Sequence, residues 1–250
     1  MNSRRCLVVL SSARLEEASH VGSTSAYSFI QAYGLLSRAH VEGECFAVLL
    51  VLSAHTHAQE NKQTNKQTKT KKVVVATPDG KEPSFDCETE EEEAWISEHR
   101  ELTSSPSNLA RVKSESWDAV CIPSSIGATV DLGTSEDLGA LVAACFEAGK
   151  PVCVIGYGLL GLAKAVSGPQ SKWVFQDYNV SGCSNMELAR LPYFSKLPML
   201  PEETAYELGG LFTASQPDAA FIIVDRKLIS GQNAVSTTLA VLNLVWLSQQ

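Results

Sequence analysis

The sequence contains no histidine after residue 99. Its five histidines are His20, His40, His55, His57 and His99. Covalent catalysis by serine or cysteine needs a base within hydrogen-bond reach of the nucleophile, and histidine is the usual base. A nucleophile and histidine pair contributed wholly by the C-terminal half of the chain is therefore excluded.

An excess of positive charge is also absent. Lysine and arginine number 20 against 28 aspartates and glutamates, which gives a formal net charge of −8. A nucleic-acid surface needs a basic face that complements phosphate. Direct nucleic-acid binding is therefore not expected as a general property of the chain.

No apolar run has the length of a membrane span. The run at residues 46–54 is far shorter than the roughly 20 residues that a spanning helix requires. The run at residues 6–10 follows two arginines but is too short for a secretory signal, so it predicts a β-strand. Several of the seven cysteines stand within strand-like apolar runs, which is typical of buried, reduced thiols. We therefore expect a cytoplasmic protein.

Short apolar runs alternate with amphipathic segments along the chain. The runs predict strands at residues 6–10, 73–76, 118–122, 152–155 and 221–225, and the amphipathic segments predict helices at residues 26–36, 89–99, 135–148, 159–166, 202–209 and 235–247. Strands that are nearly free of charge suit a sheet that is covered on both faces. The pattern predicts a single α/β domain over residues 1–250, a three-layer sandwich around a mainly parallel sheet.

Helix-end signals support several of these boundaries. Residues 134–137 have a capping-box pattern at the start of one helix, and Gly149 follows the same helix as a stop signal. Pro201 stands in the first turn of another helix, followed by two glutamates that the helix dipole favours.

Residues 38–72 interrupt this order. The second half of the segment is of low complexity and carries five lysines against the single acidic residue Glu60. It has no apolar residue that could offset the entropy of ordering. We expect a disordered insertion, either a natural loop or an artefact of splicing or of the gene model. The pair His55 and His57 falls within it and is too weak a signal for a metal site.

Residues 151–162, PVCVIGYGLLGL, have the pattern of a nucleophile elbow. A buried strand turns sharply through Gly156, Tyr157 and Gly158 into a predicted helix. In α/β enzymes the tip of such a turn carries a serine or cysteine, held above the sheet. Here the tip is glycine, which offers no nucleophile.

Two long segments carry a resemblance to a known family. Residues 116–142, SWDAVCIPSSIGATVDLGTSEDLGALV, and residues 147–165, EAGKPVCVIGYGLLGLAKA, resemble the ThiJ/PfpI superfamily, in particular its chaperone and glyoxalase branch. Further matches lie at residues 73–86, at residues 180–188, and at residues 228–241, which resemble the C-terminal loop and helix of the branch. The resemblance implies a class I glutamine amidotransferase-like fold of the flavodoxin-like type.

The resemblance also implies a degenerate active site. Active relatives have a cysteine and a histidine at the elbow, a Gly-Gly-His-Gly loop whose amides could form an oxyanion hole, and a helix glutamate that shares the thiol proton. These positions fall, in that order, on Gly156 and Tyr157, on Ser124, Ser125, Ile126 and Gly127, and near Ile30 or Gln31. Only Gly127 and Gly158 of the pattern persist. We expect no catalytic residue, no cofactor and no metal.

Other residues near the elbow could carry chemistry in its place. Cys153 and Cys121 lie in the predicted strands, where core packing is the favoured interpretation. Ser124 and Ser125 are expected to hydrogen-bond their own loop. Tyr157 could donate a hydrogen bond to a ligand, although a tyrosine that fills the emptied pocket is the favoured interpretation.

The sequence therefore favours a pseudoenzyme that acts as an interaction subunit. The resemblance implies a homo-oligomer and a subunit of an early-endosomal complex that serves a Rab GTPase and is linked to messenger RNA, so nucleic acid would be reached only through the complex. Two alternatives stay open. One is a residual hydrolase or glyoxalase-like lyase that uses Cys121, Cys153 or a bound water, and the other is a small-molecule binding module.

Overall fold

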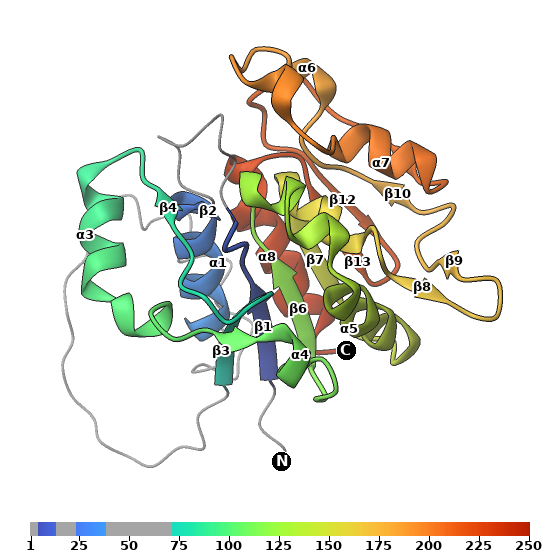
Figure 1. Ribbon diagram of the computed structural model, residues 1–250, viewed down its shortest axis with the longest axis horizontal. Helices are drawn as coiled ribbons and strands as arrows, with labels where there is room; N and C mark the ends of the chain where they lie inside the picture. Colours follow the sequence, from blue (N-terminus) through green and yellow to red (C-terminus); the bar gives the residue numbers. More distant parts are fainter. Residues whose placement is uncertain (1–4, 14–23, 39–71) are drawn as a thin grey trace.

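The computed structural model describes residues 5–13, 24–38 and 72–250 (Figure 1). The interior of the predicted insertion, residues 39–71, lies outside the described residues, and so do His55 and His57. The ends of the predicted insertion are part of regular elements, because Arg38 closes helix α1 and Lys72 opens strand β3.

A seven-stranded sheet forms the centre of the described chain, in the order β12-β13-β7-β6-β1-β3-β5. The strands are β1 (Arg5–Val9), β3 (Lys72–Thr77), β5 (Ser107–Asn108), β6 (Ala119–Ile122), β7 (Val152–Ile155), β12 (Ile222–Asp225) and β13 (Leu228–Gly231). All neighbours pair in parallel except β12 and β13, which form an antiparallel hairpin at one edge. The mainly parallel sheet is confirmed, and each of the five predicted strands is present with ends that differ by at most one residue.

Both faces of the sheet are buried, which explains why its strands are so uniformly apolar. In β1, Leu7 belongs to the core on one face and Val8 to the core on the other. The same alternation places Val120 and Val154 on the first face and Cys121 and Cys153 on the second.

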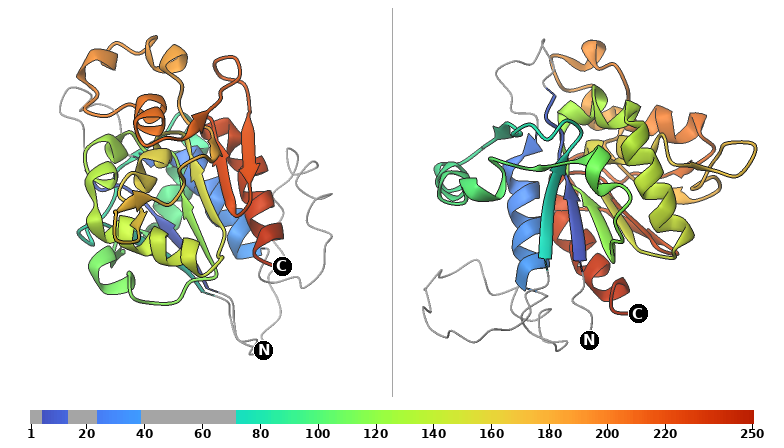
Figure 2. Two further views of the ribbon diagram at one scale, coloured as in Figure 1. Left: turned by 90° about the vertical axis from the view of Figure 1, so that its right-hand side faces the viewer. Right: turned by 60° about the horizontal axis from the view of Figure 1, so that its bottom comes forward.

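Helices cover the two faces and complete the three-layer fold (Figures 1 and 2). The helices are α1 (Ala26–Arg38), α3 (Glu90–Glu98), α4 (Leu109–Val112), α5 (Glu136–Glu147), α6 (Asn185–Leu188), α7 (Pro201–Glu207) and α8 (Thr237–Leu247). Helices α1 and α8 pack on the face of Val8, and α4 and α5 pack on the face of Leu7. None of the helices in the described part of the chain combines the length and hydrophobicity needed to cross a membrane.

Short strand pairs lie outside the main sheet. They are β2 (Thr24–Ser25) with β4 (Phe85–Asp86), β8 (Val166–Ser167) with β9 (Lys172–Trp173), and β10 (Asn179–Val180) with β11 (Leu211–Phe212). The segment from β8 to β11, which includes α6 and α7, extends beyond the edge of the sheet in Figure 1. This segment brings residues 181–187 over the end of β7.

The predicted helix at residues 159–166 is wrong. The chain forms 3₁₀ turns over Gly156–Leu162 and then the short strand β8. Glycine is a poor α-helix former, and Gly158 and Gly161 of this segment lie against Ile122 of β6. A Cβ on Gly158 would lie 2.3 Å from the carbonyl oxygen of Ile122. Close approach to the neighbouring strand therefore outweighs the apolar pattern that suggested a helix.

Two other local predictions are corrected. Strand β13 begins within residues 228–241, where the resemblance implied a loop, because a two-residue turn folds the chain back onto β12. The cap of α5 is Ser135 rather than Thr134, since the Ser135 side chain accepts a hydrogen bond from the amide of Leu138. Gly149, with φ of +65°, ends the same helix as predicted.

Candidate functional site

The tip of the elbow has an unusual backbone and carries no side chain. Gly156 follows β7 directly and has φ of +56°, in the left-handed region that favours glycine. The tip stands at the carboxyl end of a strand inside the parallel sheet, where α/β folds commonly place ligands. The backbone of an elbow is present, and the group that would react is absent.

Two neighbouring side chains occupy the space that a nucleophile would need. A Cβ built on Gly156 would lie 2.5 Å from Ser124 Oγ and 3.2 Å from Cys183 Sγ. Real Cβ atoms are essentially never found within 3.0 Å of a heavy atom of a residue that is not their neighbour in the chain. A cysteine at position 156 would therefore have to displace Ser124.

Among the described cysteines, Cys183 has its thiol against the tip. The sequence analysis considered Cys121 and Cys153 and missed it. It lies in the loop before α6 with 7% of its surface exposed. Burial raises the pKa of the Cys183 thiol well above its ordinary value, and the carboxylate of Glu187 adds to the rise. The amides of Tyr157 and Cys183 lower the pKa by a smaller amount. The thiol is therefore protonated at neutral pH and weakly nucleophilic.

Tyr157 follows the tip, at the position where the resemblance implied a histidine. Its side chain is 9% exposed, and its hydroxyl has no hydrogen-bond partner among the described residues. Burial raises the pKa of the Tyr157 phenol strongly, with smaller contributions from Cys183, Tyr193 and Glu187. The ring remains neutral and cannot accept the proton of a thiol.

Glu187 holds the loops beside the elbow together. Its carboxylate is buried and accepts hydrogen bonds from Asn233 Nδ2 at 2.8 Å, from the Asp218 amide at 2.9 Å and from the Ser184 amide at 3.3 Å. The Ser184 hydroxyl in turn accepts from the Glu187 amide, which completes a capping box at the start of α6. This carboxylate is committed to backbone and side-chain donors rather than placed as a base.

The loop where the resemblance implied an oxyanion hole is tied to other parts of the fold. The Ser124 amide donates to Ser28 Oγ on α1 at 3.2 Å, and Thr24 Oγ1 donates to Ser125 Oγ at 3.3 Å. These partners belong to α1 and β2, so the loop is held by the elements beside it. At Gly127 a Cβ would lie 2.2 Å from Ser11 Oγ, so this glycine is required by close packing.

The remaining candidates lie away from the tip. Cys121 and Cys153 are register neighbours on β6 and β7, fully buried on the α1 and α8 face. A hydrogen bond with Cys153, together with burial, raises the pKa of Cys121 well above its ordinary value. Gln31, near the expected helix glutamate, accepts a hydrogen bond from Thr238 on α8.

Neither a histidine base nor a metal centre is found in the described part of the chain. His99 is the one described histidine, and its ring stacks on Trp95 at a centroid distance of 4.1 Å at the end of α3. Among the same residues, no group of three or more His, Cys, Asp or Glu side chains could hold a metal ion.

Comparison with known proteins reveals close relatives. The chain is 40% identical over 176 residues to cattle glutamine amidotransferase-like class 1 domain-containing protein 1, a match that covers 70% of this chain and 80% of the relative. No protein-family model matches the chain.

Solved structures share the fold at low identity. Glyoxalase III from Candida albicans is similar with a TM-score of 0.75 at 11% identity, covering 98% of this chain and 97% of that chain. A ThiJ/PfpI domain protein from Brachyspira murdochii has a TM-score of 0.57 at 12% identity and covers 100% and 98% of the two chains. Both comparisons support the three-layer α/β architecture described above.

Proposed function

Because the chain belongs to the family of glutamine amidotransferase-like class 1 domain-containing protein 1, within the ThiJ/PfpI superfamily, we propose that it is a non-catalytic member acting as an interaction subunit. The observation that carries the proposal is the occupied tip of the elbow. Gly156 provides no nucleophile, and Ser124 and Cys183 fill the space of its missing side chain. Covalent catalysis in this fold needs a free nucleophile and a base beside it.

The partners in this proposal follow from the family resemblance. They are a second copy of the chain and the protein subunits of an early-endosomal complex that serves a Rab GTPase, with messenger RNA reached only through that complex. The proposed location is the cytoplasm and the surface of early endosomes. Co-purification of the chain with such subunits, and its sedimentation as a dimer or larger species, would support this assignment, whereas a monomer that joins no complex would contradict it.

Thiol labelling of the native protein tests the non-catalytic proposal directly. With limiting iodoacetamide at neutral pH, we expect no rapid labelling of Cys121, Cys153 or Cys183, because all three are buried. Cys87 is part-exposed, but burial and nearby carboxylates raise its pKa, so it should label slowly. Its rate should increase as the pH rises from 7 toward 9, since the thiolate is the reacting form. Peptide mapping by mass spectrometry identifies the labelled site.

The same samples should be assayed for turnover of methylglyoxal and of an activated ester. We expect both rates to stay at background and to be unchanged in Cys183→Ser. Selective, fast labelling of Cys183, Cys121 or Cys153, together with loss of turnover in its serine variant, would show that the chemistry has moved to that thiol.

One observation favours a second candidate, a small-molecule binding module. The buried Tyr157 hydroxyl has no hydrogen-bond partner among the described residues, and such a group is normally satisfied by protein, water or ligand. A ligand that binds only the native state raises the melting temperature. This candidate predicts that glutamine or methylglyoxal raises the melting temperature in a concentration-dependent way and that Tyr157→Phe removes the effect. Equal shifts in the melting temperature of the wild type and of Tyr157→Phe would contradict this candidate.

A further inference from the structure

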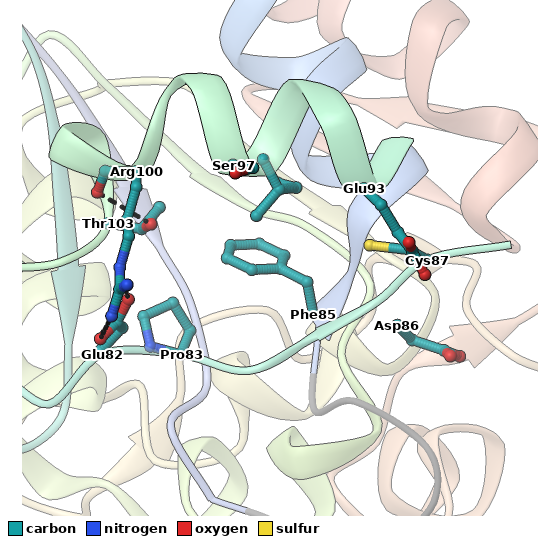
Figure 3. Close-up of a pocket in the computed structure, with 10 residues that line it drawn as sticks. Glu82, Pro83, Phe85, Asp86, Cys87, Glu93, Ser97, Arg100 and Thr103 are labelled. Atoms are coloured by element: carbon teal, nitrogen blue, oxygen red, sulfur yellow. Dashed lines mark hydrogen bonds and ion pairs between the residues drawn. The ribbon is translucent and has the colours of Figure 1, made fainter. Parts of the chain in front are cut away.

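An open groove lies between α3 and the extended segment before it (Figure 3). We call it the α3 groove, and its main lining residues are Glu82, Phe85, Asp86, Glu93, Ile96 and Arg100. The groove has a volume of about 600 Å³, within the usual range of binding pockets. Figure 3 shows the Phe85 ring pointing toward α3 between the two walls.

The apolar floor of the groove is supported by an aromatic cluster. Phe85 packs on Phe29 of α1 with ring centroids 5.3 Å apart, and Trp95 meets the same Phe29 edge-on at 6.1 Å. Tyr33 and the stacked ring of His99 hold Trp95 from other sides. The wall formed by α3 is therefore anchored, and the groove is present before any partner binds.

The two ends of the groove differ in charge. At one end Arg100 is paired with Glu82 through two contacts, Nε to Oε1 at 3.0 Å and Nη2 to Oε2 at 3.3 Å. At the other end Glu93 lies beside Cys87, and Asp86 precedes Cys87 with its carboxylate pointing away from the thiol (Figure 3). Burial raises the pKa of Cys87 first, and the charges of the neighbouring carboxylates raise it further. The cation of Arg100 is thus held away from the acidic end.

Negative charge is concentrated around this groove to an unusual degree. Residues 82–101 hold nine carboxylates and one arginine, a net charge of −8, which equals the formal charge of the whole chain. The charges of all other residues therefore cancel. No residue of α3 is fully buried, and four consecutive glutamates form its first turn. A surface of this sign repels nucleic acid and anionic lipid and attracts a cationic partner.

We propose that the α3 groove is the docking site for a basic segment of a partner protein, a proposal that rests on the proposed role as an interaction subunit. The segment carries lysine or arginine next to an apolar side chain. The apolar side chain lies against Phe85 and Ile96, and the cation lies at the acidic end beside Glu93. The negative charge of the groove indicates a basic partner segment. The apolar floor distinguishes the groove from an acidic helix that only contacts water.

Fluorescence anisotropy with the full-length protein tests the proposal. The probe is a fluorescein-labelled dodecapeptide with three Lys-Lys-Leu-Ser repeats, and two control peptides replace leucine by serine or lysine by glutamate. We expect the first peptide to bind, the serine control to bind about tenfold more weakly, and the glutamate control not to bind. Affinity should fall as salt is raised.

Protein variants locate the site of binding. Ser97→Trp fills the groove from its exposed wall and should reduce the affinity at least tenfold. Glu93→Gln should reduce it about threefold, in line with the strength of exposed charge pairs. The matched control is Glu203→Gln on α7, which removes the same charge from an exposed position of another helix and should leave the affinity unchanged.

Several results would overturn the proposal. Equal binding of the leucine and serine peptides, with no effect of Ser97→Trp, would show that the surface attracts basic peptides through non-specific charge alone. Tighter binding of a peptide of residues 61–72 than of the leucine peptide would assign the groove to the chain's own lysine-rich segment. Self-association that Ser97→Trp abolishes would assign it to a second copy. None of these results affects the thiol-labelling and turnover test, so failure of the groove and failure of the non-catalytic proposal are distinguishable.

Discussion

Replacing Gly156 by cysteine is expected to lower the free energy of unfolding by about 3 kcal/mol without creating an active enzyme. The left-handed backbone at this position strains any residue with a Cβ. The new side chain must also displace Ser124 Oγ, which would lie 2.5 Å from its Cβ. For a chain of this size the loss corresponds to a fall in melting temperature of roughly 6–12 °C.

A double-mutant cycle separates steric conflict from backbone strain. Ser124→Gly removes the atom nearest to the new side chain, so the combination Gly156→Cys with Ser124→Gly should recover about half of the loss. Chemical denaturation of the wild type, both single variants and the double variant measures the coupling energy. Turnover should remain at background in all four proteins, because the one histidine among the described residues, His99, stacks on Trp95 at the end of α3.

If Gly156→Cys unfolded with the same free energy as the wild type, Ser124 and Cys183 would have to move aside freely. The tip would then have room for a side chain, contrary to the proposal. Restored turnover in the double variant would be more serious for the proposal. It would mean that a base lies within reach of position 156.

Glu187→Ala is expected to have a similar or larger effect on stability, a loss of about 3 to 5 kcal/mol. The substitution removes the acceptor of three hydrogen bonds and leaves Asn233 Nδ2 and the amides of Asp218 and Ser184 without it. Glu187→Gln keeps one acceptor oxygen and should lose about half as much. The free energy of unfolding from urea denaturation measures both changes.

The matched control for this prediction is Glu203→Ala on the exposed face of α7, which should change stability by less than about 0.5 kcal/mol. Local unfolding provides a further measurement. Hydrogen exchange at residues 181–188 should accelerate in Glu187→Ala more than exchange in β7 does, because the carboxylate joins this loop to its neighbours. Equal stability of Glu187→Ala and Glu203→Ala would contradict the structural role assigned to Glu187.

The architecture was predictable because its signals are local. Strands such as Val152–Ile155 are buried on both faces, so their apolar character is visible in the sequence without any knowledge of their neighbours. The same holds for the helices that carry an apolar stripe or an end signal, as in α5 with Gly149 after it. The segment after Gly156 was mispredicted as an α-helix because its apolar pattern says nothing about contact with Ile122.

The role of Cys183 could not be predicted in the same way. Its segment resembles the family, yet nothing in it indicates that the thiol lies beside Gly156, 27 positions earlier in the chain. The α3 groove is a similar case. The acidic run was visible in the sequence, but the floor under it depends on Phe85 packing against Phe29 of a distant helix.

The amino-acid sequence by itself determined the α/β fold, the absence of a nucleophile at the elbow and the absence of histidine in the C-terminal half. Each of these depends on residue type or on periodicity within one segment. The tertiary structure alone decided what occupies the space at the tip, because Ser124, Gly156 and Cys183 come from three separate loops. Parallel strands bring their carboxyl ends to one edge of the sheet, so the loops that follow them meet there although they are far apart in the chain.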